Sequence, residues 1–404
     1  MTERIYHRDS HCMSCTATVE KCEKTESGWT VVLDRTVLFE NAGGQPADTG
    51  YIGEARVSGS DEIAGELVVS VDRPLTVGKE YTVTVDAERR LDLMRQHTGE
   101  HLLSWAFYKL FGINNVGFHL AEDYATIDLD AVLTDAQVEE AERLANDIVM
   151  QNRRVGAVVY ETEEAFEAAG LALRKQSEKA VPPIRIVSIE GADVCTCCAP
   201  HCDTTGEIGL ILVTDRIKWK SGNRLTFLCG GRALRLVQRE HRMLDTVARG
   251  FSVARTDVLT TVEKREKEAS ALRKREKELT GALDAYLAKD LKEKAVRAGK
   301  TMLIAEDLGA GYPAERVRSL AIAATAEKDA LTLLFGNAGG KLAYAVCVSK
   351  DSKIDAGEIA QAVNPIAGTK GGGRGTLAQG TGPVPEGFDS VLSGLRSYLM
   401  NRLK

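Results

Sequence analysis

The sequence predicts an α+β protein with several domains. Short runs that alternate between apolar and polar residues, such as 29–33 and 81–85, occur near the N-terminus and are typical of half-buried strands. Helical and strand patterns then alternate, a Lys-, Glu- and Leu-rich stretch follows, and a second mixed region ends the chain. We therefore expect a small β barrel over 1–90, a two-layer α/β domain over 91–245, a long helical or coiled-coil segment over 246–299, and a C-terminal α/β domain with a Gly-rich loop over 300–404.

The bulk composition is typical of a soluble globular protein. The chain has 404 residues, of which 44% are hydrophobic and 27% charged. No apolar run reaches the roughly 18 residues of a membrane helix, and the N-terminus lacks the apolar region of a signal peptide. Nine cysteines, an odd number, favour a reducing cytoplasm over a disulfide framework. The net charge of −6 argues against indiscriminate coating of nucleic acid, although a local basic face could still bind RNA.

A glycine turn interrupts the strand pattern of the predicted barrel at the Gly-Gly-Gln-Pro run, 43–46. Glycine lets the backbone approach a ligand closely, and proline fixes the direction of the chain that follows. A plain turn between strands is the simpler interpretation of the two glycines alone. For Cys12, Cys15 and Cys22 we expect ordinary thiols, with a second metal site as the alternative, because the Cys-x-x-Cys pair has no matching second pair.

The middle region mixes helices with strands. A helix begins at Thr134, with Asp135 in its first turn and apolar residues on one face. Further elements are a helix around 93–104, strands at 124–130, 184–189 and 209–213, and a strand that runs into a helix within 224–233.

Apolar residues recur at alternating steps of three and four in the helical segment, and Arg265 and Glu276 break the pattern. This spacing predicts a long helix or an antiparallel helical hairpin, and it also fits a coiled coil. A spacer is the plainest role, while dimerisation of two chains and support along an RNA stay open. The apolar positions are Val258, Val262, Ala269, Leu272, Leu279, Leu283 and Tyr286.

The C-terminal region predicts strands at 302–305, 331–335 and 342–348 and helices at 313–326 and 388–403. A Gly-rich loop, 368–382, carries Lys370 and Arg374 and no acidic residue. Bare backbone N–H groups with two cations would suit a phosphate or another anion, and a flexible surface loop is an equally good interpretation.

His97 and His101 are the strongest chemical signal. Four residues apart on a helix, the two imidazoles lie on one face, one turn apart. About a hundred residues later, Cys197 and His201 complete a set of three imidazoles and one thiolate, which suits zinc. From chemistry alone the register is open, because Cys195, Cys198 and Cys202 could also reach a metal ion.

His97 to His101 also reads His-x-x-Glu-His, an arrangement of inverted zinc peptidases in which Glu100 would be the general base. Those enzymes take an acidic third ligand from a later helix, whereas the later cluster here is Cys and His. The role of the metal stays open between generating hydroxide from water and orienting a substrate amine.

Three motifs taken together resemble those of a known family. They are Thr36 with 43–46 and Asp48-x-Gly50, then His97-x-x-x-His101-Leu102-Leu103, and then Cys197-x-x-x-His201 with Thr205-Gly206-x-Ile208-Gly209. They resemble the editing domain of alanyl-tRNA synthetase and, more closely, its free-standing relatives, the alanyl-tRNA editing proteins of the AlaX type. The helical segment and the Gly-rich C-terminal region resemble the synthetase's C-terminal region, a DHH-associated domain. The resemblance therefore spans nearly the whole chain and indicates the long form of the family.

The resemblance implies a reaction and a role for several residues. The family deacylates tRNA(Ala) wrongly charged with serine or glycine and spares Ala-tRNA(Ala), without ATP. By this resemblance 91–245 is a zinc-binding editing domain and 300–404 binds tRNA, with Lys370 and Arg374 as candidate contacts. Thr36 would read the serine hydroxyl and Gln45 would lie beside the substrate. The implied Zn²⁺ ligands are His97, His101, Cys197 and His201.

The chain departs from the family at the glycine motif. The family often has Tyr-Pro-x-Gly-Gly-Gly-Gln, whereas residues 39–45 read Phe-Glu-Asn-Ala-Gly-Gly-Gln. This change keeps open an alternative function, a zinc-stabilised tRNA-binding adaptor without hydrolytic activity. Since no class II aminoacylation domain precedes residue 1, we do not expect a synthetase. We expect a cytoplasmic protein without a membrane partner, and the helical segment offers a route to a homodimer.

Overall fold

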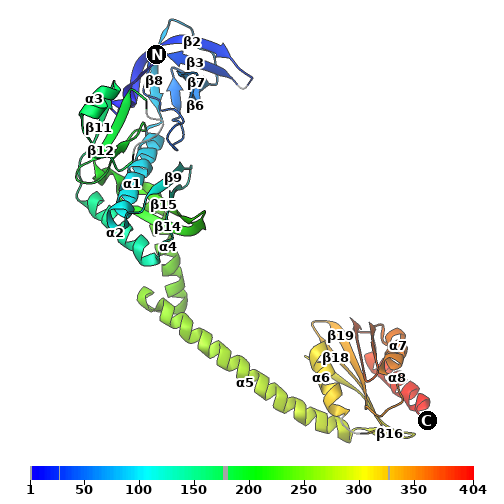
Figure 1. Ribbon diagram of the computed structural model, residues 1–404. Helices are drawn as coiled ribbons and strands as arrows, with labels where there is room; N and C mark the ends of the chain where they lie inside the picture. Colours follow the sequence, from blue (N-terminus) through cyan, green and yellow to red (C-terminus); the bar gives the residue numbers. More distant parts are fainter. Residues whose placement is uncertain (1, 27, 176–180, 326–327) are drawn as a thin grey trace. The chain divides into compact units, whose positions relative to one another are not determined.

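The computed structural model describes residues 2–26, 28–175, 181–325 and 328–404 (Figure 1). The chain divides into two compact units, residues 1–255 and 256–404. Both contain helices and sheets, so the predicted α+β class is confirmed. Across the described residues, no helix combines the length and the apolar character that crossing a bilayer requires. The finer division into four domains stays a prediction.

The first unit begins with the small barrel that the alternating pattern predicts. Inward-facing side chains such as Val31, Val69 and Val83 are fully buried and fill its interior. A short parallel pair, β1 (Glu3–Arg4) with β4 (Arg35–Thr36), and a 3-10 turn (Ile5–His7) lie beside it. The closed barrel has the order β2 (Ser14–Lys24), β3 (Trp29–Leu33), β7 (Glu66–Val71), β6 (Ala55–Ile63), β5 (Gly50–Ile52) and β8 (Glu80–Val85).

A layer of helices packs on an antiparallel sheet after the barrel. The helices are α1 (Ala87–Phe111) and α2 (Asp135–Met150), which share one core with the sheet. Thr134 caps α2 in a capping box with Gln137, as its position before the apolar pattern predicts. The sheet order is β14 (Ile211–Trp219), β15 (Gly222–Cys229), β10 (Ala125–Leu129) and β9 (Asn115–Leu120).

A three-stranded sheet completes the first unit, and α4 (Gly230–Phe251) follows β15 directly. The predicted strand at 184–189 is confirmed as β12 (Ile184–Ile189). The remaining elements are β11 (Val155–Tyr160), β13 (Val194–Thr196), α3 (Glu163–Ala168) and a 3-10 turn (Thr205–Ile208).

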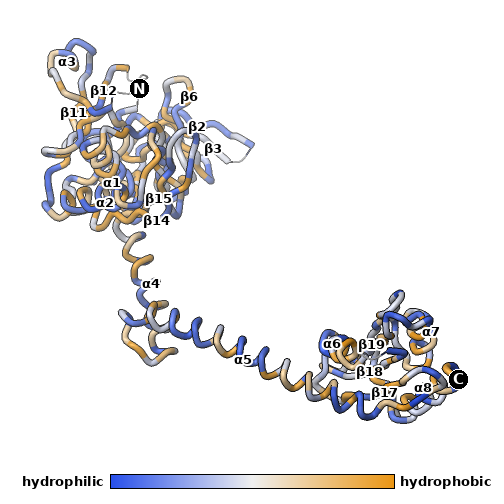
Figure 2. Tube along the Cα trace, turned by 60° about the horizontal axis from the view of Figure 1, so that its bottom comes forward, coloured by the Kyte–Doolittle hydropathy of each residue, from blue (hydrophilic) through white to orange (hydrophobic). Residues whose placement is uncertain are grey.

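In the second unit, a long helix precedes an α/β domain. After a 3-10 turn (Arg255–Asp257), α5 (Val258–Glu293) is one continuous helix, so the helical-hairpin alternative is wrong. Figure 2 shows hydrophobic positions spaced along α5 between hydrophilic ones, and Leu272 and Tyr286 are exposed. Pairing of α5 in a coiled coil stays a prediction.

The C-terminal domain is a six-stranded sheet with helices on both faces. One face packs on α6 (Ala314–Ala324) and the other on α7 (Ala356–Ala367) and α8 (Phe388–Arg402). Ala326, the predicted end of the first of these helices, lies outside the described residues. The strand order is β16 (Val296–Ala298), β17 (Thr301–Ala310), β18 (Ala330–Ala338), β19 (Lys341–Val348), β21 (Leu377–Pro383) and β20 (Lys370–Arg374).

The predicted Gly-rich loop at 368–382 is wrong, because most of it forms the antiparallel hairpin β20–β21. Glycine is needed there for close packing rather than for flexibility. A Cβ added at Gly371 or Gly373 would lie 2.2 Å from a carbonyl oxygen of β21, and one at Gly357 of α7 would lie 2.3 Å from the Gly373 carbonyl oxygen. The glycines thus let β20 pair closely with β21 under α7.

Candidate metal centre

Helix α1 presents His97 and His101 together. Asp86 caps its first turn by accepting a hydrogen bond from the Arg89 amide, and Gly112 ends it in the left-handed conformation. Both histidines are 3% exposed, and their ring centroids lie 5.4 Å apart. The helix therefore holds two imidazoles side by side in a buried site, as the four-residue spacing predicts.

The loop after β13 brings Cys197 and His201 to these rings. Cys197 Sγ lies 3.5 Å from His97 Nε2 and 3.3 Å from His201 Nε2. One ligand atom from each of His97, His101, Cys197 and His201 lies within 4.8 Å of those of the other three. The structure thus gathers the four residues that were expected to form a metal site, and this group could hold a metal ion.

Each histidine of this group is oriented through its other ring nitrogen. His97 Nδ1 lies 2.8 Å from Gln45 Oε1, and His201 Nδ1 lies 3.0 Å from Thr98 Oγ1. His101 Nδ1 lies 3.1 Å from the carboxylate of Asp193. Such outer contacts fix the ring tautomers and leave the Nε2 atoms free to bind a metal.

The glycine turn places Gln45 against His97. Gly43 and Gly44 adopt positive φ angles of 60° and 80°, and the backbones of Ala42 and Gln45 pair across the turn. A Cβ on Gly44 would lie 2.8 Å from the Phe118 carbonyl oxygen, so only glycine fits there. The turn therefore docks on β9, and it does more than connect two strands.

A fully buried ion pair ties this turn to α1. Arg90 Nε lies 3.0 Å from Asp48 Oδ2, and that carboxylate also accepts a 2.7 Å hydrogen bond from the Phe39 amide. Arg90 donates further hydrogen bonds to the carbonyl oxygens of Val37 and Ser10. The Ser10 hydroxyl in turn accepts a hydrogen bond from the backbone amide of His201. The segments that carry Gln45, His97 and His201 are thus linked through one pair of charges.

The pKa shifts favour metal binding at Cys197 and His201 and oppose it at His101. Burial opposes ionisation of Cys197, but the adjacent His97 and His201 lower the pKa of its thiol well below the ordinary value. Burial lowers the pKa of His201 to about 3, so this ring is neutral. Burial also opposes a charge on His101, yet Cys195 and Asp193 raise its pKa well above the ordinary value. Thiolates and neutral imidazoles bind metals, and a metal cation would displace the proton that His101 holds.

The other cysteines have different surroundings. Cys195 Sγ lies 3.2 Å from His101 Nδ1, behind the ring, and not beside its Nε2. Burial raises the pKa of Cys198 and of Cys202 to about 12. All nine cysteines of the chain are free thiols.

Thr36 and Glu100, two further residues with a predicted role, are both buried. Thr36 is fully buried at the end of β4, and its hydroxyl accepts a 3.0 Å hydrogen bond from the Leu38 amide. Glu100 is buried beside His101, with Oε1 2.5 Å from Ser104 Oγ and Oε2 3.9 Å from His101 Nε2. Lys370 and Arg374 belong to the exposed strand β20 of the second unit, whereas this group belongs to the first.

Several residues around the site carry no sequence signal. Asp193 and Thr98 contact histidines about a hundred residues away in the chain, so no local pattern reveals them. No motif marks Phe118 or Arg185 either, although their contacts are closer in the chain. The Phe118 ring lies 4.9 Å from that of His97, and Arg185 donates hydrogen bonds to the carbonyl oxygens of Cys197 and Ala199. Only the adjacency of Asp193 to the cysteine cluster could have drawn attention to it.

Fold and site together define an α+β protein with a buried His/Cys group that could hold a metal ion, and comparison with known proteins gives its family. Residues 184–225 match the family described as the threonyl and alanyl tRNA synthetase second additional domain, and residues 300–401 match the DHHA1 domain. The alanyl-tRNA editing protein AlaX-L of Pyrococcus horikoshii is 30% identical over 99% of this chain and 100% of its own length. The alanyl-tRNA editing protein Aarsd1-B of Xenopus laevis is 31% identical over 68% of this chain and 67% of its own length. This chain belongs to the family of alanyl-tRNA editing proteins of the AlaX type.

Longer proteins are also similar to this chain. The alanine–tRNA ligase of Pyrococcus furiosus is 32% identical over 94% of this chain, which spans 42% of the ligase. The chain therefore covers about two fifths of the length of such ligases.

Proposed function

We propose that this protein is a zinc-dependent trans-editing hydrolase. It deacylates tRNA(Ala) mischarged with serine and, secondarily, with glycine, and it spares Ala-tRNA(Ala). The observation that carries this proposal is the group of His97, His101, Cys197 and His201. Gln45 of the glycine motif is hydrogen-bonded to the His97 ring. Membership of the AlaX family supplies the reaction class.

The donor set supports zinc as the metal. Three imidazole nitrogens and one thiolate are the donors that Zn²⁺ prefers, and the engaged Nδ1 atoms leave three Nε2 atoms for it. Asp193 is held in turn by Arg174, whose Nε lies 2.5 Å from the carboxylate. When bound, zinc would either lower the pKa of a water to about 7 or hold the substrate amine.

The remaining part of the proposed catalysis is the positioning of the reactants. An aminoacyl ester is already activated, so the site mainly orients water and stabilises negative charge on the carbonyl oxygen. Gln45 Nε2 is buried and has no hydrogen-bond partner among the described residues, so we assign it to donate to that oxygen. Phe118 covers one side of the His97 ring and would keep bulk water from that side.

Discrimination between serine and alanine requires a polar contact to the extra hydroxyl. A site that hydrogen-bonds a substrate hydroxyl rejects the analogue without it far more strongly than an apolar pocket does. We assign this contact to Thr36, whose hydroxyl is buried in the segment that leads to the glycine turn.

We assign the second unit to tRNA binding, in which β20 contributes Lys370 and Arg374. Both side chains are exposed at the edge strand of the sheet. We further propose that the protein acts in the cytoplasm and that α5 offers a surface for a homodimer.

A deacylation panel tests the function directly. Purified protein with its zinc content measured is given Ser-, Gly- and Ala-tRNA(Ala), and release of the amino acid is followed. We expect fast release of serine, slower release of glycine and no release of alanine. Tight tRNA binding without release of any amino acid, from folded and zinc-loaded protein, would instead support an adaptor. The same panel on Glu100→Gln addresses the peptidase hypothesis, because a peptidase-type general base at Glu100 would make this variant inactive.

A further inference from the structure

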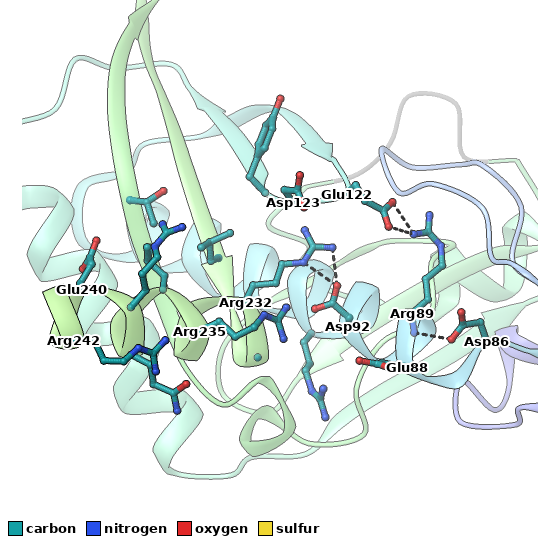
Figure 3. A pocket seen from close by; sticks show the side chains of 18 of the residues that line it. Asp86, Glu88, Arg89, Asp92, Glu122, Asp123, Arg232, Arg235, Glu240 and Arg242 are labelled. Carbon is teal, nitrogen blue, oxygen red and sulfur yellow. Dashed lines mark hydrogen bonds and ion pairs between the residues drawn. The ribbon is translucent and has the colours of Figure 1, made fainter.

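A concave region lies between α1 and α4 (Figure 3). This groove has a volume of about 1360 Å³ and is lined mainly by charged and polar side chains. From α1 it takes residues such as Asp92 and Arg95, which precede His97, and none of the four residues of the metal group lines it. A polar groove of this size does not suit a small apolar ligand.

The charges of the groove are divided between its walls. The α4 wall carries Arg232, Arg235, Arg239 and Arg242 and one acid, Glu240. The facing wall, formed by the start of α1 and the turn between β9 and β10, carries the arginines Arg89 and Arg95 together with most of the acids, namely Asp86, Glu88, Asp92, Glu122 and Asp123.

Two ion pairs neutralise part of this set. Arg232 Nη2 lies 2.7 Å from Asp92 Oδ2, and Arg89 Nη1 lies 2.7 Å from Glu122 Oε2. Dashed lines in Figure 3 mark both pairs. These contacts do not involve the outer three arginines of the α4 wall, and Glu240 on that wall and Asp86, Glu88 and Asp123 on the facing wall also keep their charges.

These three arginines form a stripe. Arg235, Arg239 and Arg242 are spaced by four and three residues, so they share one face of α4 over about 10 Å. All three are exposed, and none has an ion-pair partner among the described residues. Guanidinium groups are the side chains best suited to contact phosphates.

The two walls together suit RNA better than a free anion. Phosphates would follow the arginine stripe, whereas carboxylates on the facing wall can accept hydrogen bonds from ribose 2′-hydroxyls. Tyr124 at the rim is 44% exposed and offers a face on which a base can stack.

We propose that this groove binds the backbone of the substrate tRNA, with Arg235, Arg239 and Arg242 on its phosphates. The proposal rests on the proposed function for the identity of the RNA. It gives the first unit an RNA contact of its own, separate from Lys370 and Arg374 on the second unit.

The test uses the full-length, zinc-loaded protein and the triple variant Arg235→Ala/Arg239→Ala/Arg242→Ala. Binding of uncharged tRNA(Ala) is measured by fluorescence anisotropy at several salt concentrations. Because the side chains are exposed, the variant should fold and keep its zinc. We expect an affinity loss on the order of tenfold or more and a salt slope smaller by about two to three.

A matched control removes three exposed arginines from another helix, Arg265→Ala/Arg273→Ala/Arg275→Ala on α5. An equal loss of affinity in both variants would overturn the proposal, since net charge would then account for the effect. Unchanged affinity and salt slope in the α4 variant would overturn it as well. A deacylation assay distinguishes the groove proposal from the proposed function. If the wild type is inactive but its tRNA binding still depends on the arginine stripe, the proposed function is contradicted and the groove proposal is supported.

Discussion

Gln45 is the residue through which the barrel contacts the metal centre. Its Oε1 accepts a hydrogen bond from His97 Nδ1 and thereby leaves Nε2 of that ring for the metal that we propose. Loss of such an outer contact typically costs ten- to a hundredfold in metal affinity. We therefore expect Gln45→Ala to weaken zinc binding by roughly ten- to a hundredfold, measured by competition with a chromogenic chelator. Gln137→Ala, which removes a capping contact of α2, should leave zinc affinity unchanged.

The Thr36 hydroxyl is the group to which we assign discrimination between serine and alanine. Thr36→Val keeps the shape of the side chain and removes the polar group, so the ratio of kcat/KM for Ser-tRNA(Ala) over Ala-tRNA(Ala) should fall, by roughly tenfold or more. Thr36→Ser should retain most of the preference. An unchanged ratio in Thr36→Val would remove this role, and the hydroxyl would then serve only its bond to the Leu38 amide.

Some residues of the candidate site could be predicted from the sequence, and others could not. His97 and His101 are predictable because helix geometry converts a spacing of four into one face. Cys197 is not singled out by chemistry, since Cys195 and Cys198 flank it, and only the resemblance to a family chose among them. Asp193 and Thr98 escape prediction because their contacts form through the tertiary fold.

At the scale of elements, the Arg90–Asp48 pair joins α1 to the glycine turn. Both side chains are fully buried, so removal of one partner leaves a charge without compensation in the interior. Asp48→Ala should lower the free energy of unfolding by about 3–5 kcal/mol in urea titrations. Asp72→Ala, which breaks an exposed pair with Arg73, should cost less than about 1 kcal/mol. A similar cost for both variants would mean that the buried pair does not hold the turn.

The hairpin β20–β21 shows why a glycine-rich sequence misleads. The same residues that read as a mobile loop are required by close strand pairing, which depends on partners that a local pattern does not contain. By contrast, Thr134 and the strand at 184–189 were predictable because a cap and an apolar run are local features.

The position of Lys370 and Arg374 on this exposed strand leads to a prediction of its own. Lys370→Ala with Arg374→Ala should weaken tRNA binding and reduce its salt slope by about two. Binding curves at several salt concentrations measure both quantities. If neither quantity changes, β20 is not a contact, and α7 with α8 would be the next face to test.

At the scale of the whole molecule, we propose different roles for the two compact units. The first unit contains the metal group and the arginine stripe, and the second contains the DHHA1 match. The mixed fold class and most strands were predictable from periodicity. The convergence of the glycine turn, α1 and the cysteine loop was not, because it depends on contacts between residues up to about two hundred positions apart, such as His201 with Ser10.

A metal titration tests the central claim most directly. Protein stripped of metal is reconstituted with increasing Zn²⁺, and hydrolysis of Ser-tRNA(Ala) is measured at each step alongside Cys197→Ala and a circular dichroism control for folding. We predict that activity returns at one equivalent of zinc in the wild type and does not return in the variant. Full activity of the folded, metal-free protein, or zinc-restored activity in Cys197→Ala at one equivalent, would contradict the account.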